Sequence, residues 1–183
     1  DAVKQRFGRV DILVNSSGFT QPVPHADLEA LTDELIDRMF AVNWRGQFAV
    51  IRAFAPMLKA TGDGLIVNIS SIAGIVGRNP AAYSSIAYST SKGALVHFTR
   101  DLAVKWAQYN IRVNAIAPGF FPTRMTEGVL PHLIEDLKQN VPMGRPGRDG
   151  EIKGVAVFLA SDASNYVTGQ TLAVDGGSTA VTV

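Results

Sequence analysis

A tyrosine and a lysine stand four residues apart in the sequence YSTSK, as Tyr88 and Lys92. The surrounding pattern predicts that both lie near the start of a long helix, where side chains at this spacing project from the same face. An ammonium group beside a phenol favours the phenolate, so we expect the pKa of Tyr88 to fall from about 10 toward neutral pH. Such a tyrosine can act as a general acid or base on a ketone or an alcohol. The spacing alone is weak evidence, because many such pairs lie on protein surfaces.

Short apolar runs alternate along the chain with segments of helical periodicity. The runs that we predict to be buried strands span residues 10–15, 65–69, 111–117 and 171–174. The segments that we predict to be helical span residues 27–60, 88–108, part of 120–140, and 151–160. Pro56 lies inside the first of these segments and predicts a kink or a break there. Continuously apolar strands that alternate with helices indicate an α/β fold with a parallel sheet covered on both faces, in a single domain over residues 1–183.

Polar and turn-forming residues concentrate where the predicted strands end. The sequences at the ends of the first three strands are Asn15-Ser16-Ser17-Gly18, Ser70-Ser71 and Pro118-Gly119. Tyr88 and Lys92 begin the helix that follows the second strand. Ligands of open parallel sheets bind beyond the carboxyl ends of the strands, so we expect these groups to meet at one edge of the sheet.

With these motifs in this order, the chain resembles the short-chain dehydrogenase/reductase family over essentially its whole length. The segments that carry the resemblance are NSSG at 15–18, VNWRG at 42–46, LIVNISS at 65–71, YSTSK at 88–92, PGFFPT at 118–123 and TGQTLAVDGG at 168–177. The resemblance implies a Rossmann-like, doubly wound sheet. It also implies an enzyme that uses NAD or NADP to interconvert a secondary alcohol and a ketone, because no side chain can supply a hydride.

The resemblance implies roles for four side chains at a catalytic centre. Tyr88 would exchange a proton with the substrate oxygen. Lys92 would lower the pKa of Tyr88 and hold the hydroxyl groups of the nicotinamide ribose. Ser71 would stabilise charge on the substrate oxygen. Asn43 would hold a water molecule that links Lys92 to solvent.

Neighbouring residues compete for two of these roles. Ser71 is preferred to Ser70, because two glycines follow Ser71 at the family's usual spacing. Tyr83 has no lysine four residues later, so Tyr88 is preferred as the catalytic tyrosine. The resemblance also implies cofactor contacts by Asn15, Ser16, Ser17, Gly18, Ile69, Tyr88, Lys92, Pro118, Gly119 and Thr123.

The substrate class stays open between those of 3-oxoacyl reductases and of gluconate or sugar-alcohol dehydrogenases, which the chain resembles most. Apolar residues after the third strand fit a substrate pocket as well as a core: Phe120, Phe121, Met125, Val129 and Leu130. Arg78 and Arg124 are expected at the surface, with contact to an anionic substrate as the alternative. The family's usual dimers and tetramers imply a homodimer or homotetramer.

No Gly-x-x-x-Gly-x-Gly sequence lies between a strand and a helix in these 183 residues. The resemblance places that phosphate-binding loop in an amino-terminal βαβαβ part, which would be missing here, leaving the strand at 10–15 with an unpaired edge and an uncovered apolar face. We therefore expect the sequence to be part of a longer chain. The alternative is a truncated, non-catalytic oligomerisation module that cannot bind cofactor.

Composition excludes several other classes of protein. The formal net charge is +1 and there is no basic run, so we do not expect nucleic-acid binding. The chain has no cysteine, which fits a reducing cytoplasm, and no apolar run of the roughly 18 residues that span a membrane. Its histidines are widely separated in the sequence, so we expect no metal site.

Overall fold

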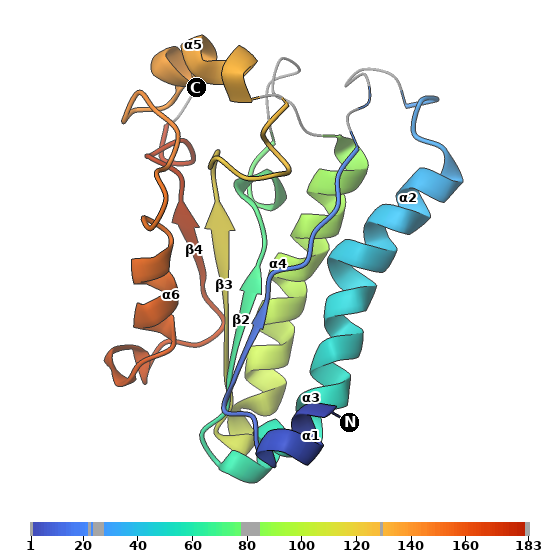
Figure 1. Ribbon diagram of the computed structural model, residues 1–183, viewed down its shortest axis with the longest axis vertical. Coiled ribbons are helices and arrows are strands. Elements are labelled where there is room, and N and C mark those ends of the chain that lie inside the picture. The colour runs from blue at the N-terminus through green and yellow to red at the C-terminus, as the bar shows by residue number, and fades with distance from the viewer. Residues whose placement is uncertain (1, 22, 24–27, 78–84, 129, 182–183) are drawn as a thin grey trace.

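The computed structural model describes residues 2–181 except for residues 22, 24–27, 78–84 and 129. Four strands form one parallel sheet in the order β1-β2-β3-β4 (Figure 1). These strands are β1 (Ile12–Asn15), β2 (Leu65–Ile69), β3 (Arg112–Pro118) and β4 (Thr171–Val174). Because every neighbouring pair is parallel, all four carboxyl ends lie at the same edge of the sheet. The predicted α/β fold with a parallel sheet is confirmed.

Helices lie on both faces of this sheet. The helical elements are α1 (Ala2–Phe7), α2 (Asp33–Phe40), the π-helical η1 (Ala41–Gly46), α3 (Gln47–Thr61), η2 (Ile72–Gly74), α4 (Ile86–Trp106), η3 (Ala107–Tyr109), α5 (Leu130–Asn140), α6 (Lys153–Leu159) and η4 (Asp162–Ser164). Helices α3 and α4 lie on one face, α6 lies on the other, and α5 lies beyond the carboxyl ends of the strands (Figure 1). This is the predicted doubly wound arrangement.

Two apolar clusters fix the layers, because side chains alternate between the two faces of a strand. Ile66 of β2 belongs to the cluster that packs against α3 and α4, with Leu13, Ile51, Leu58 and Leu102 among its members. Leu65 and Val67 belong to the cluster on the opposite face, together with Ile116 and with Leu159 of α6. Strand β2 is therefore buried on both faces, and this explains its continuously apolar sequence.

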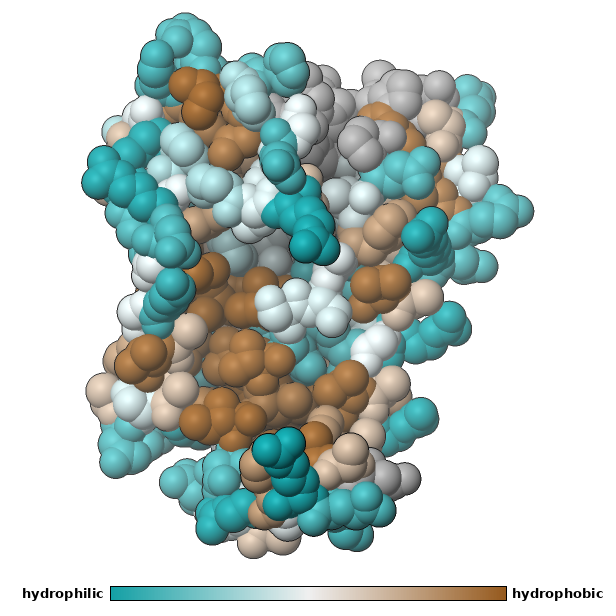
Figure 2. All heavy atoms as spheres, viewed as in Figure 1, coloured by the Kyte–Doolittle hydropathy of each residue, from teal (hydrophilic) through white to brown (hydrophobic). Residues whose placement is uncertain are grey.

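Strand β1, which its apolar run alone predicted to be a buried strand, is buried on one face only. Leu13 is buried under α3, but the side chains of Ile12 and Val14 are 46% and 51% exposed. Strand β1 lies at the edge of the sheet and pairs only with β2 within the described part of the chain. Ile12 and Val14 lie on the face that carries α6, which packs over strands further into the sheet. Figure 2 shows hydrophobic side chains gathered over this face. The expected unpaired edge and uncovered apolar face are both present.

The long helical segment differs from the prediction at its start and at its irregular point. Helix α2 begins at Asp33, where the hydroxyl of Thr32 accepts a hydrogen bond from the backbone N–H of Leu35 at 3.3 Å. Asp27, the predicted start, lies outside the described residues. Helix α3 continues through Pro56 to Thr61, so of the predicted kink or break the break is wrong and the kink stays a prediction. The departure from α-helical geometry is the π-helix η1, and such segments are often found at functional sites.

A chain of buried hydrogen bonds joins β1, β2 and α4. The side-chain amide of Asn15 donates to Oδ1 of Asn68 at 3.0 Å, and Nδ2 of Asn68 donates to the Thr99 hydroxyl at 3.0 Å. The Thr99 hydroxyl donates in turn to the backbone carbonyl of Leu95 at 2.9 Å. Asn15 and Asn68 are register partners, so a one-residue slip would separate them and leave buried polar groups unpaired.

We expect the substitution Asn68→Ala to lower the free energy of unfolding by about 1–3 kcal/mol, because it leaves Asn15 and Thr99 each without a buried partner. The measurement is urea denaturation at constant m-value. Asn165→Ala, at an exposed position, is the matched control. Equal stability of the two variants would contradict a structural role for the Asn15–Asn68–Thr99 chain.

Candidate active site

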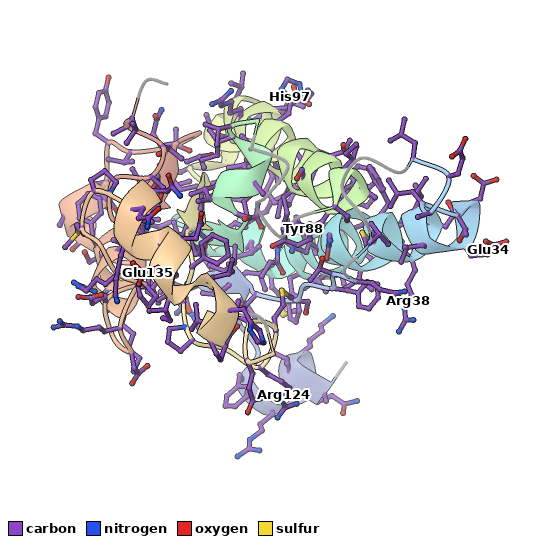
Figure 3. All side chains as sticks on the ribbon, turned by 90° about the horizontal axis from the view of Figure 1, so that it is seen from above. Glu34, Arg38, Tyr88, His97, Arg124 and Glu135 are labelled. Atoms are coloured by element: carbon purple, nitrogen blue, oxygen red, sulfur yellow. The ribbon has the colours of Figure 1, made fainter. Side chains whose placement is uncertain are left out.

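The start of α4 is set by Ser85, whose hydroxyl accepts a hydrogen bond from the backbone N–H of Tyr88 at 3.2 Å. The helix therefore begins at Ile86, slightly earlier than predicted. Tyr88 and Lys92 lie in its first two turns and on one face, with Lys92 Nζ 5.9 Å from the centroid of the Tyr88 ring. In the view from above the strand ends, Tyr88 lies near the middle of the molecule, and the labelled Glu34, Arg38, His97, Arg124 and Glu135 lie around it (Figure 3).

Lys92 is buried, with only 3% of its surface exposed. Its ammonium group donates a hydrogen bond at 2.9 Å to the backbone carbonyl of Ile69, the last residue of β2. Burial disfavours the charged form and lowers the pKa of Lys92 to about 8. The helix face that carries the pair is thereby tied to the carboxyl end of the neighbouring strand.

The pKa of Tyr88 is raised, so the predicted decrease is contradicted for the protein without ligands. Burial of the phenol raises this pKa, and a hydrogen bond with the side chain of Ser71 opposes the increase only in part. The expected effect of Lys92 does not develop, because its ammonium group is itself desolvated and donates to the Ile69 carbonyl. The spacing correctly placed the two side chains on one face, but it did not predict where the N–H groups of Lys92 are directed.

The two adjacent serines have different surroundings. Ser70 is buried, and its hydroxyl donates to the backbone carbonyl of Lys92 at 3.0 Å, so it joins β2 to α4. Ser71 is half-buried, and its hydroxyl accepts the backbone N–H of Ala73 at 3.2 Å and is hydrogen-bonded with Tyr88. Only Ser71 therefore has a side chain at the phenol, which supports the choice made from the sequence. Tyr83, the rival tyrosine, lies outside the described residues.

Gly74 allows η2 to approach α4 beside Lys92. A Cβ atom added at Gly74 would lie 2.5 Å from the carbonyl carbon of Lys92 and 2.7 Å from the backbone nitrogen of Gly93. Since real Cβ contacts do not reach such distances, a larger residue would displace the backbone that carries Lys92. In the sequence analysis, Gly74 counted as one of the two glycines that follow Ser71.

Asn43 lies within the π-helix η1 and is fully buried. Its Oδ1 accepts the backbone N–H of Phe19 at 2.7 Å. Its Nδ2 donates to the backbone carbonyl of Phe19 at 2.9 Å and to the hydroxyl of Ser91 at 2.9 Å. Both N–H groups of the amide are thus used, and Oδ1 keeps one lone pair. Asn43 therefore holds the segment after β1 against α4.

The turn after β1 approaches Lys92 through Gly18. A Cβ atom added at Gly18 would lie 3.5 Å from Lys92 Nζ and 3.9 Å from Oδ1 of Asn43. Ser16 and Ser17 are exposed, and Ser17 uses its backbone carbonyl to accept a hydrogen bond from the side chain of Gln47. The side chain of Asn15 is buried against Asn68. A ligand at this turn would therefore contact atoms of the turn other than the Asn15 side chain.

Pro118 and Gly119 lie at the end of β3, beside the end of β4. The backbone N–H of Gly119 donates to the carbonyl of Val174 at 2.9 Å, and an added Cβ would lie 2.9 Å from Cα of Asp175. Thr123 is further away, on an exposed turn where its backbone N–H donates to the Thr126 hydroxyl at 2.9 Å. Among the described residues, Thr123 therefore makes its side-chain hydrogen bond within a local turn, to Thr126, and not to Tyr88, Lys92 or Ser71.

Of the two roles that the sequence left open for the residues after β3, the core role is seen at Phe120 and Leu130, and the substrate-pocket role stays a prediction. Phe120 packs against the cluster of Leu133, Leu137 and Val141. Phe120 and Phe121 also line a cavity of about 260 Å³ beside the end of β4. Met125 is 45% exposed, but its Cε would lie 3.6 Å from a Cβ added at Gly18. Leu130 packs against the same cluster as Phe120, and Arg124 is exposed. Arg78 and Val129 lie outside the described residues.

Three residues of this region were missed by the sequence analysis. Ser85 begins α4, Ser91 binds Asn43, and Gln47 binds the turn after β1. Ser85 had a local signal, because a serine three residues before Tyr88 is typical of a helix N-cap. Ser91 and Gln47 contact groups far away in the sequence, so no local pattern indicates them. In the described part of the chain there is no group of three or more residues that could hold a metal ion, and no helix long and apolar enough to cross a membrane.

Comparison with known proteins agrees with this geometry. A family model described as enoyl-(acyl carrier protein) reductase matches residues 1–179. The 3-oxoacyl-[acyl-carrier-protein] reductase of Thermotoga maritima is 41% identical over 97% of this chain and 69% of that protein. Galactitol 2-dehydrogenase (L-tagatose-forming) of Cereibacter sphaeroides is 46% identical over 93% of this chain and 66% of that protein. The crystal structure of a gluconate 5-dehydrogenase from Burkholderia cenocepacia in complex with NADP and tartrate has a TM-score of 0.91 and 36% identity, and it covers 100% of this chain and 69% of that one.

The buried ammonium of Lys92 should make the free energy of unfolding rise with pH. The folded pKa is about 8, compared with an ordinary value of 10.5, so between these values the unfolded state holds more protons. The free-energy cost of burying the charged ammonium group is fully present below pH 8 and decreases as pH rises. From pH 7.5 to 9.5 we expect a gain of about 1–2 kcal/mol in urea denaturation relative to Lys92→Met. This range stays below the raised pKa of Tyr88. Parallel pH profiles for the two proteins would contradict the burial of a titrating ammonium.

We expect Gly74→Ala to destabilise the protein by about 1–3 kcal/mol, because the added methyl group overlaps the backbone at Lys92. Gly77→Ala is the matched control, since an added Cβ there has no neighbour within 4 Å in the part of the chain that the structure describes. Thermal and urea denaturation of both variants measure the difference. Equal destabilisation by the two substitutions would contradict a close contact between η2 and the backbone of α4.

Proposed function

Because the chain belongs to the short-chain dehydrogenase/reductase family of oxidoreductases, we propose that it interconverts a secondary alcohol and a ketone with NAD or NADP. The observation that carries this proposal is the meeting of Ser71, Tyr88 and Lys92 at the carboxyl edge of a parallel sheet, with Tyr88 hydrogen-bonded to Ser71. Ligands of such sheets bind at this edge. The chain spans 66–69% of the length of the relatives described above, so the activity of a whole protein is part of the proposal.

Tyr88 is the proposed proton donor and acceptor. Its raised pKa keeps the phenol protonated near neutral pH, which is the form that protonates a ketone oxygen during reduction. Alcohol oxidation requires the phenolate, and a charged Lys92 would favour that form. The nicotinamide cofactor, when bound, supplies or accepts the hydride. Ser71 is the proposed hydrogen-bond donor to the substrate oxygen, where charge develops.

We propose that Asn43 holds a relay water. Its other hydrogen bonds limit which of its atoms can bind that water. Its two N–H groups are taken by Phe19 and Ser91, so the side chain can hold a water only as an acceptor at Oδ1. This atom and Lys92 Nζ lie on the same side of Gly18, which makes a water between them geometrically reasonable. Asn43 is therefore proposed both to position the turn after β1 and to accept from the water.

The site has unused capacity for the hydroxyl groups of a cofactor. Within the described residues, the ammonium group of Lys92 has three N–H donors and one hydrogen-bond acceptor, the Ile69 carbonyl. Gly18 and Gly119 keep the surrounding backbones free of side chains. We propose that Lys92 and Tyr88 hold the ribose. The remaining proposed contacts come from the turn residues Asn15, Ser16, Ser17 and Gly18, from Ile69, and from Pro118, Gly119 and Thr123.

The names of the relatives leave two proposed substrate classes, 3-oxoacyl thioesters and sugar alcohols or sugar acids. A spectrophotometric panel of 3-oxoacyl thioesters, keto-sugars and polyols with both cofactors distinguishes them.

We propose that residues 1–183 act as one domain in the cytoplasm and that copies associate through α3 and α4. Phe48, Val50 and Val104 of these helices are 37%, 39% and 80% exposed. The non-catalytic oligomerisation module stays a prediction.

We expect Tyr88→Phe to lower kcat by about 10²- to 10⁴-fold, because the variant cannot exchange a proton with the substrate oxygen. Cofactor affinity, measured by fluorescence titration with NADH or NADPH, should fall by a smaller factor than kcat, because the variant loses one of the two proposed ribose contacts and keeps Lys92. Tyr166→Phe is the matched control, since Tyr166 is fully exposed. Near-normal turnover by Tyr88→Phe would show that the proton-transfer assignment is wrong.

A further inference from the structure

We propose that Gln47 is a positioning residue that holds the turn of residues 17–19 against the site formed by Lys92 and Asn43. Gln47 is the first residue of α3 and is 2% exposed. Its Nε2 donates a hydrogen bond to the backbone carbonyl of Ser17 at 3.0 Å. The inference rests on the proposed function, because it assigns this turn a part in cofactor binding.

Gln47 and Asn43 form one clamp on this turn. They stand four residues apart in a continuous helical segment, so their side chains project from neighbouring positions on one face. Asn43 binds both the N–H and the carbonyl of Phe19, and Gln47 binds the carbonyl of Ser17. The two amides therefore fix the backbone on both sides of Gly18. Among the described residues, loss of Gln47 would leave the turn hydrogen-bonded to this helical segment through Phe19 alone.

The clamped residue, Gly18, is the part of the turn that faces the reactive groups. An added Cβ there would lie 3.5 Å from Lys92 Nζ, 3.6 Å from Cε of Met125 and 3.9 Å from Oδ1 of Asn43. A displacement of the turn would therefore change the space beside the ammonium group. It would not move Tyr88 or Ser71, which are held by α4 and by the end of β2.

Packing alone does not explain an amide at position 47. The Oε1 atom of Gln47 is buried and has no hydrogen-bond partner among the described residues. Burying an amide with one end unpaired is unfavourable, and an apolar side chain of similar size would avoid that cost. The amide cannot be reversed, because Oε1 would then face the Ser17 carbonyl oxygen. The hydrogen bond to Ser17 is thus the interaction that distinguishes glutamine from an apolar residue here.

The experiment compares Gln47→Leu and Gln47→Glu with the unchanged protein. Gln108→Leu is the matched control, because Gln108 is exposed and, among the described residues, its side chain binds the carbonyl of Lys105 in its own helix end. The first readout is amide hydrogen exchange of a peptide that covers residues 16–20, with peptides from α4 as the internal reference. The second readout is the KM for NAD and NADP compared with kcat at saturating cofactor.

For Gln47→Leu we expect at least tenfold faster exchange at residues 16–20, with α4 unchanged. The KM for the cofactor should rise at least tenfold, with kcat reduced less than threefold. In Gln47→Glu the introduced carboxyl group is buried, so its pKa rises and its protonated form can donate to Ser17 at low pH. The KM of this variant should therefore approach that of the parent near pH 5.5 and increase above pH 7. A purely structural defect would show no such recovery.

The proposal is overturned if exchange at residues 16–20 is unchanged, or if α4 loses protection to the same extent. It is also overturned if the KM of Gln47→Glu follows the pH profile of Gln47→Leu. Failure of the proposed oxidoreductase function would be seen separately, as the absence of NAD- or NADP-dependent turnover in the parent protein. If the parent protein shows no turnover, the hydrogen-exchange comparison still tests the proposal, because it requires no cofactor.

Discussion

A charged side chain that is 97% removed from solvent needs a compensating partner, and for Lys92 the Ile69 carbonyl is that partner. A second hydrogen bond runs in the other direction, from the hydroxyl of Ser70 to the backbone carbonyl of Lys92. Together they lock the end of β2 to the first turns of α4. Because Tyr88 is on the same face of α4 and Ser71 is at the same strand end, this lock also fixes the phenol relative to the serine hydroxyl.

Small residues and buried amides complete the surroundings of the ammonium group from two sides. Gly74 allows η2 to touch the backbone of α4, and Gly18 allows the turn after β1 to approach Nζ. The turn is held by Asn43, whose own helical segment adopts π geometry at that point. The polar groups at this edge therefore depend on backbone contacts from β1, β2, α3 and α4 at once. This explains why the positions of these polar groups are fixed although few of them are charged.

The sequence predicted those features that depend on local pattern. Continuous apolar runs located the strands, and the Tyr88 to Lys92 spacing placed both side chains on one face. The apolar run at residues 10–15 did not itself reveal the exposure of Ile12 and Val14, which agrees instead with the uncovered face expected from the resemblance. The π-helix was not predictable either, since it accompanies contacts between Asn43 and Phe19 that are distant in the sequence. Pro56 was a local signal for a break that the α-helix does not show.

The predicted decrease in the pKa of Tyr88 is contradicted because of the same burial that defines the site. Burial raises the pKa of Tyr88 and lowers that of Lys92, so each group tends toward its neutral form. Additional acceptors at the free N–H groups of Lys92 would replace its lost hydration and raise the pKa of Lys92. A lysine that is firmly charged would then favour the phenolate and lower the pKa of Tyr88. The acidity that the Tyr–x–x–x–Lys spacing predicts therefore requires a hydroxyl-bearing ligand beside Nζ. In the proposed function, ligand binding and proton transfer would then be coupled through one buried ammonium group.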